Sequence, residues 1–218
     1  ERKMFTDTEG IVFRQVKTVN GRRMVLLFSQ KFGKISAGTS IGEKARSKST
    51  LALRPFTYGK YELFKNRDNY HINGTDVIRS YYGIGEDIEK YMYCSYALEF
   101  TEKLLQEDAP APGVFRMLLD FFDMMEKRSK KYSTLILAYQ IKVLQEFGSM
   151  PQINQCVLCG GNDEAALFSV KEGGILCGNC CLKYHDIEND KLIYTVNFGI
   201  VNVLRYILDN PLKSFENL

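Results

Sequence analysis

The chain has 218 residues, of which 45% are hydrophobic and 25% charged, and its formal net charge is +3. These values are typical of a globular protein with one large domain or two to three small ones. No stretch approaches the roughly 18 apolar residues that a membrane span needs, which excludes an integral membrane helix. The opening ERKMFTDTEG lacks the apolar run of a signal peptide, so we expect a cytoplasmic protein with reduced thiols.

The charge is unevenly distributed along the chain. Residues 1–82 carry 16 Lys/Arg and 7 Asp/Glu, a net charge of +9, whereas residues 83–218 carry 13 and 19, a net charge of −6. A basic N-terminal part predicts a polyanionic partner. A solvated basic surface without a partner is the alternative.

The first 80 residues predict five short strands, at residues 10–19, 22–30, 35–41, 55–65 and 70–78. They are rich in β-branched and large apolar residues, and Asn20-Gly21 between the first two is typical of a type I′ hairpin turn. Five strands in so short a segment favour a small closed barrel. We expect the five-stranded OB-fold, with a small open sandwich as the alternative.

Helical periodicity follows the strands. In residues 86–108 the inward face is predicted to contain Tyr91, Cys94, Leu98, Thr101 and Leu105. A second helix is predicted to bury Phe115, Leu118, Phe122 and Met125. Ser133 is expected to cap a third helix with Leu137, Ile141 and Leu144 inward, and a last helix presents Ile200, Val203, Leu204 and Ile207 before Asn210-Pro211.

Residues 156–181 contain five of the six cysteines. Cys156-x-x-Cys159 and Cys177-x-x-Cys180 are separated by 17 residues, with the predicted strands ALFSV and GGILC between them. This spacing is typical of a four-thiolate zinc site, because each Cys-x-x-Cys turn places two sulfurs on one side of the ion. We therefore predict one structural Zn²⁺ held by Cys156, Cys159, Cys177 and Cys180.

Other uses of these cysteines remain alternatives. Disulfides are disfavoured by the expected compartment, and a thioredoxin-like motif needs only one Cys-x-x-Cys pair. A catalytic zinc site needs a positioned acid or base, and the nearest acids, Glu164, Glu172 and Asp186, have no recognisable spacing. Cys181 or His185 is an alternative fourth ligand. Cys94 is expected to be a buried apolar residue, and His71 is expected to have no chemical role.

The basic residues predict contacts to a nucleic-acid backbone. The segment GEKARSKST contains Lys44, Arg46 and Lys48 at every second position, which is typical of a flexible arm that follows phosphates. Lys34, Arg46 and Lys48 are the foremost predicted DNA contacts, followed by Lys31, Lys44, Arg14 and Arg54. Tyr58, Tyr61 and Phe64 are candidate stacking platforms for bases, although a strand-borne aromatic residue is more often part of the barrel core.

Several short motifs, in order along essentially the whole chain, resemble the RecO family of bacterial recombination mediators. They are Thr8-Glu9-Gly10-Ile11-Val12, Phe32-Gly33-Lys34-Ile35, Arg46-Ser47-Lys48-Ser49 before Pro55-Phe56, Cys156-Val157-Leu158-Cys159-Gly160 with Cys177 and Cys180, and Leu204-Arg205-Tyr206-Ile207.

The resemblance implies an α+β multidomain protein: an N-terminal five-stranded OB-fold β-barrel, an α-helical domain and an inserted zinc ribbon with four cysteine ligands. The expected boundaries are 1–80 for the OB-fold nucleic-acid-binding domain, 81–152 for the helical domain, 153–195 for the zinc module and 196–218 for a C-terminal helix returning to the helical domain. It also implies binding of single- and double-stranded DNA, strand annealing, and loading of RecA, together with RecR, onto DNA coated by single-stranded-DNA-binding protein, whose C-terminal tail is a further contact. The alternatives are a scaffold that binds only protein and a zinc-dependent nucleic-acid-modifying enzyme.

Overall fold

The computed structural model describes residues 4–17, 23–41, 48–66, 69–183, 192–196 and 198–216. The chain forms two compact units, residues 1–140 and residues 141–217. Within the described part of the chain, no helix combines the length and the apolar composition needed to cross a membrane.

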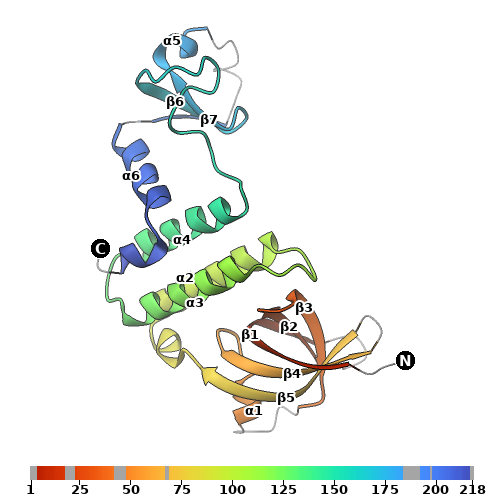
Figure 1. Ribbon diagram of the computed structural model, residues 1–218. Coiled ribbons are helices and arrows are strands. Elements are labelled where there is room, and N and C mark those ends of the chain that lie inside the picture. The colour runs from red at the N-terminus through yellow and green to blue at the C-terminus, as the bar shows by residue number, and fades with distance from the viewer. Residues whose placement is uncertain are drawn as a thin grey trace. The chain divides into compact units, whose positions relative to one another are not determined.

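Five strands of the first unit close into a barrel of order β1-β2-β3-β5-β4, so the predicted OB-like barrel is confirmed and the open sandwich is wrong (Figure 1). The strands are β1 (Met4–Lys17), β2 (Arg23–Ser29), β3 (Gly33–Thr39), β4 (Tyr58–Asn66) and β5 (Asn69–Arg79). Neighbouring strands are antiparallel except β3 and β5, whose parallel pairing closes the barrel. The predicted Asn20-Gly21 turn lies outside the described residues.

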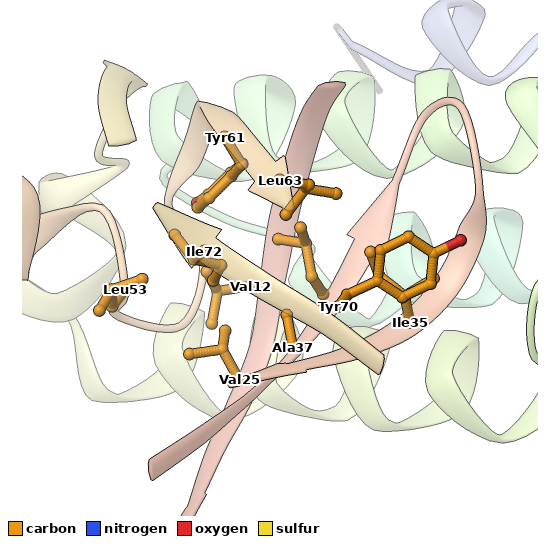
Figure 2. Packing of buried hydrophobic residues seen from close by; sticks show 10 residues of the cluster. Val12, Val25, Ile35, Ala37, Leu53, Tyr61, Leu63, Tyr70 and Ile72 are labelled. Carbon is orange, nitrogen blue, oxygen red and sulfur yellow. The ribbon is translucent and has the colours of Figure 1, made fainter. Parts of the chain in front are cut away.

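Alternating residues of these strands fill the barrel (Figure 2). The buried cluster contains Val12, Val25, Leu27, Ile35, Ala37, Leu53, Tyr61, Leu63, Tyr70 and Ile72. Tyr61 is fully buried and its hydroxyl donates to the Ala52 carbonyl at 2.6 Å. Tyr61 is therefore a core residue and not a stacking platform, because its ring belongs to the core and its hydroxyl has a partner there.

Two further predictions for this part of the chain are wrong. β1 begins at Met4, six residues before the predicted Gly10. The predicted flexible arm ends in a short helix, α1 (Lys48–Leu51), so its last residues are ordered. Lys44 and Arg46 lie outside the described residues.

Three long helices follow a short 3₁₀ turn, η1 (Tyr82–Glu86). They are α2 (Ile88–Leu104), α3 (Pro112–Lys127) and α4 (Tyr132–Glu146). The Asp87 carboxylate accepts from the Glu89 and Lys90 amides and so caps α2. Pro112 opens α3, where its missing amide proton costs no helical hydrogen bond.

The predicted helix faces are partly correct. Cys94, Leu98, Thr101 and Leu105 are buried as predicted, and so are Phe115, Leu118, Phe122 and Met125. Tyr91 and Leu137 are each 46% exposed, so their inward placement is wrong. Ser133 does not cap α4, because the helix already begins at Tyr132.

The second unit contains a small ribbon and the last helix. β6 (Ala165–Ser169) pairs with β7 (Gly174–Cys177) and β8 (Ile193–Thr195). The short helix α5 (Gly178–Cys181) follows β7, and α6 (Phe198–Asp209) precedes the 3₁₀ turn η2 (Leu212–Phe215). In α6 the predicted inward residue Ile207 is buried, but Ile200 and Val203 are exposed and Val201 is buried in their place.

Candidate metal centre and nucleic-acid interface

Four cysteine sulfurs converge in the second unit. Cys156 and Cys159 lie in the turn before β6, Cys177 ends β7, and Cys180 lies in α5. The sulfurs all lie within 4.8 Å of one another, and the Cys159 and Cys177 sulfurs are 3.8 Å apart. Tetrahedral Zn–S bonds of about 2.3 Å separate neighbouring sulfurs by about 3.8 Å, so the cluster has the dimensions of a four-thiolate zinc site.

The backbone of the first Cys-x-x-Cys turn is shaped for this cluster. The Gly160 amide donates to the Cys156 carbonyl at 2.8 Å, and Gly160 has a left-handed φ of +70°. The next amide, Gly161, donates to the Cys159 sulfur at 3.4 Å, while its carbonyl accepts from the Cys156 amide at 2.8 Å. Because glycine adopts such a φ with little strain, Gly160 lets the chain curl around the sulfurs.

The electrostatics of the cluster favour a bound cation. Burial raises the pKa of Cys156, but backbone amide donors of Cys177, Cys159 and Leu158 outweigh it and lower the pKa to about 6. The contact with Cys159 and then burial raise the pKa of Cys180 to about 12. Sulfurs this close repel one another as thiolates, so a dipositive ion is the natural way to hold all four deprotonated.

The other cysteines stand apart from the cluster. Cys181 packs into the small core of the ribbon, and its thiol donates to the Leu176 carbonyl at 3.9 Å. Cys94 is fully buried in α2, and this burial raises its pKa. His185 lies outside the described residues. Among the described residues the four predicted ligands are therefore the set that comes together.

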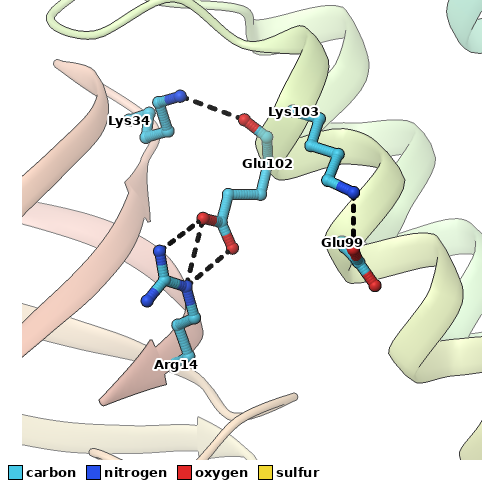
Figure 3. Close-up of polar contacts among 5 residues, drawn as sticks. All are labelled: Arg14, Lys34, Glu99, Glu102 and Lys103. Atoms are coloured by element: carbon cyan, nitrogen blue, oxygen red, sulfur yellow. Dashed lines mark hydrogen bonds and ion pairs between the residues drawn. The ribbon is translucent and has the colours of Figure 1, made fainter. Parts of the chain in front are cut away.

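Two of the predicted DNA contacts also hold the barrel to α2 (Figure 3). The Lys34 ammonium donates to the Glu102 carbonyl at 3.0 Å. The Arg14 guanidinium binds the Glu102 carboxylate in bidentate fashion, at 2.9 Å and 3.1 Å, with the Arg14 side chain 55% exposed. An ammonium carries three N–H donors, so Lys34 keeps donors for another acceptor while it binds the Glu102 carbonyl. The positive charge of Arg14 is balanced by the Glu102 carboxylate.

The Gly33-Lys34 segment is itself a contact between β3 and the loop after α2. The Asp108 amide donates to the Lys34 carbonyl at 3.1 Å, and a Cβ on Gly33 would lie 2.0 Å from the Ala109 carbonyl oxygen. Gly33 therefore permits a close approach of two backbones. The sequence shows that a glycine stands at this position. It does not show that Gly33 approaches Ala109, because that contact depends on the tertiary fold.

The remaining predicted contacts differ in their surroundings. Lys31 and Arg54 are exposed, and nothing is described of the Lys48 side chain. The Tyr58 hydroxyl donates to the Glu9 carboxylate, and burial together with this bond raises the pKa of Tyr58 to about 12. Phe64 is half-buried on the outer face of β4, where it contacts Phe5. Phe5 is not among the predicted site residues, because its strand was predicted to start at Gly10.

Comparison with known proteins identifies the family. The family model described as the recombination protein O N terminal matches residues 4–81, and the model of the C terminal matches residues 85–218. This chain belongs to the RecO family. The family places it among proteins of DNA repair and recombination.

Similar proteins from several bacteria match nearly the whole chain. A DNA repair protein RecO of Acetivibrio thermocellus is 28% identical over 216 residues, covering 97% of this chain and 84% of the relative. A DNA repair protein RecO of Alkaliphilus metalliredigens is 29% identical, covering 99% and 85%. A third, of Halalkalibacterium halodurans, is 28% identical over 202 residues, covering 93% and 77%.

Proposed function

We propose that this protein is a recombination mediator that binds single- and double-stranded DNA and anneals complementary strands. With RecR, it helps to load RecA onto DNA coated by single-stranded-DNA-binding protein, whose C-terminal tail it contacts. One observation carries the proposal: a closed OB-like barrel is built from the residues of net charge +9. Barrels of this class bind nucleic-acid strands, and their cations supply sequence-independent affinity for phosphates.

The proposed phosphate contacts are Lys34, Arg46 and Lys48, then Lys31, Lys44, Arg14 and Arg54. Lys31 and Arg54 are exposed, which supports their role in this proposal. Arg14 ranks last, because binding phosphate there competes with the Glu102 carboxylate. The sequence-independence of such contacts suits annealing, in which base pairing supplies the specificity.

We propose further that Cys156, Cys159, Cys177 and Cys180 hold one Zn²⁺. The donor set and the spacing of the sulfurs fit a structural site, in which all four positions are occupied by protein. The ion supplies folding free energy to the ribbon and no chemical step. The protein is accordingly proposed to act without turning over a substrate, in the reducing cytoplasm at the nucleoid.

Annealing of labelled complementary oligonucleotides, with and without single-stranded-DNA-binding protein, tests this function. We expect the purified protein to accelerate annealing without consuming a nucleotide and to do so on coated strands as well. Absence of DNA binding at low ionic strength contradicts the proposal and favours a scaffold that binds only protein. A chemically altered DNA product contradicts it in favour of an enzyme.

A further inference from the structure

A row of rings crosses the outer face of the barrel. Phe5 of β1 pairs with Phe64 of β4, and Phe64 pairs with His71 of β5. The ring centroids are 5.2 Å apart for Phe5 and Phe64 and 6.4 Å apart for Phe64 and His71. Because Tyr70 and Ile72 on either side of His71 are buried, His71 points away from the core. Three neighbouring strands thus present aromatic side chains on one surface.

The fourth strand leaves room for this row. Gly38 of β3 pairs with His71, and a Cβ on Gly38 would lie 2.9 Å from His71 Nδ1. The missing side chain leaves the space that the imidazole occupies. Together these residues line a groove of about 320 Å³, whose full lining is Phe5, Gly38, Ser40, Phe64, His71, Ile72 and Asn73.

The groove has the composition of a site for a planar, polar-edged ring. The Phe5 side chain is 67% exposed, which leaves an unused aromatic face on a strand. Ser40, His71 and Asn73 line the groove and carry hydrogen-bonding atoms for the edge of a ring. The volume is near the lower end of small-molecule sites, about 300–1,000 Å³, so it suits one base better than a larger ligand.

The described charges beside the groove restrict the path of a nucleic-acid backbone. Two positions along the strands from Phe5 and Phe64, Asp7 pairs with Glu62. A phosphate chain is repelled at this acidic pair, so it is expected to pass the groove on the opposite side.

We propose that Phe5, Phe64 and His71 form a stacking site for an unpaired nucleobase of single-stranded DNA, with the sugar–phosphate chain on the side of the groove away from Asp7 and Glu62. This inference rests on the proposed function and adds a base contact to its phosphate contacts. Stacking on aromatic rings accepts every base. The site thereby distinguishes single strands from duplex DNA, whose bases are already stacked.

Binding of two oligonucleotides of equal length tests the proposal, one a thymidine homopolymer and the other a fully abasic strand. The abasic strand keeps the phosphates and removes the bases. The variants are Phe5→Leu, which removes the ring and keeps an apolar side chain, and Phe64→Leu. The control is Tyr82→Ala, which removes a 74% exposed ring in η1. Thermal melting by circular dichroism checks that each variant is folded.

We expect the wild-type protein to bind the thymidine strand more tightly than the abasic strand. Phe5→Leu is expected to weaken thymidine-strand binding by about 5- to 20-fold, with abasic-strand and duplex binding unchanged. Tyr82→Ala should match the wild type on every DNA. Phe64→Leu should behave as Phe5→Leu does.

Two results overturn the inference in distinguishable ways. If the wild type binds both strands but Phe5→Leu and Phe64→Leu leave the ratio of their affinities unchanged, the stacking site is wrong and the proposed function stands. If the wild type binds no DNA at low ionic strength, the proposed function fails and the stacking site fails with it.

Discussion

Gly33 shows how a single residue fixes the contact between the barrel and the helices. It adopts a φ of +73°, and its α-carbon faces the Ala109 carbonyl so closely that a Cβ would lie 2.0 Å from the oxygen. Beside it, the Lys34 ammonium reaches the Glu102 carbonyl. The Gly33-Lys34 segment, which the sequence predicts to lead into a strand, therefore also connects the barrel to the helices of the first unit.

Substitution of Gly33 is predicted to destabilise the protein through a clash more than through backbone strain. We expect Gly33→Ala to lower the free energy of unfolding by about 2–4 kcal/mol in urea titrations followed by circular dichroism. Gly33→Asn is the matched control, because asparagine tolerates a left-handed φ but still carries a Cβ. Recovery of most of the stability in Gly33→Asn would show that strain, and not Ala109, sets the loss.

At the scale of elements, the cysteine ribbon has very little apolar core of its own. Its buried cluster consists of Cys156, Leu176 and Cys177, with a few half-buried residues packed against it. Segments this small rarely fold without a disulfide or a metal. We therefore expect the β6–β7 ribbon to depend on the proposed Zn²⁺ for its stability.

Loss of one ligand is predicted to release the metal, whereas loss of the neighbouring cysteine is not. Cys159→Ser should abolish stoichiometric zinc, measured by elemental analysis, and lower the melting temperature, because the proposed ion would contribute on the order of 10 kcal/mol to folding this segment. Cys181→Ser is the control and should retain the zinc. Chelation of the wild type should reproduce Cys159→Ser. Unchanged melting and metal content after chelation would contradict the site.

The elements differ in how far the sequence could predict them. β2 to β5 are short segments with β-branched and large apolar residues, separated by turn residues, so the barrel was predictable. The convergence of the four cysteines was predictable from their spacing. The start of β1 was not, because an inward position is taken by Thr8, whose hydroxyl bonds to Ser29 at 2.8 Å within the core. α4 was misread because Leu135, Ile136, Ala138 and Tyr139 are all buried, so no narrow apolar stripe selects one face. The contact of Gly33 with Ala109 joins residues far apart in sequence, beyond the reach of local patterns.

At the scale of the whole molecule, charge separates the chain into a basic N-terminal segment and an acidic remainder, +9 for residues 1–82 and −6 for residues 83–218. A polyanion is drawn to the first and repelled by the second. Affinity that comes from phosphates alone is sensitive to salt, because each bound phosphate releases counterions. The salt dependence of binding therefore reports how many phosphates the protein neutralises.

Removal of three proposed phosphate-binding side chains should flatten this dependence. For single-stranded DNA, the combined variant Lys34→Ala, Arg46→Ala and Lys48→Ala is expected to reduce the log–log salt slope by about 0.7 for each phosphate that is no longer neutralised. Lys34→Ala alone should also lower the free energy of unfolding by about 1 kcal/mol, since the Glu102 carbonyl then has no ammonium donor. An unaltered slope in the triple variant would move the binding surface elsewhere on the protein.

The parallel pairing of β3 and β5, which closes the barrel, is short. β3 and β5 meet through only three residue pairs, Ala37 with Tyr70, Gly38 with His71 and Thr39 with Ile72. Because so few residue pairs join β3 and β5, the barrel is expected to open first between these two strands, which form its seam. DNA bound at the proposed stacking site would contact both strands of this seam, Gly38 of β3 and His71 of β5, so that binding would stabilise the closed barrel.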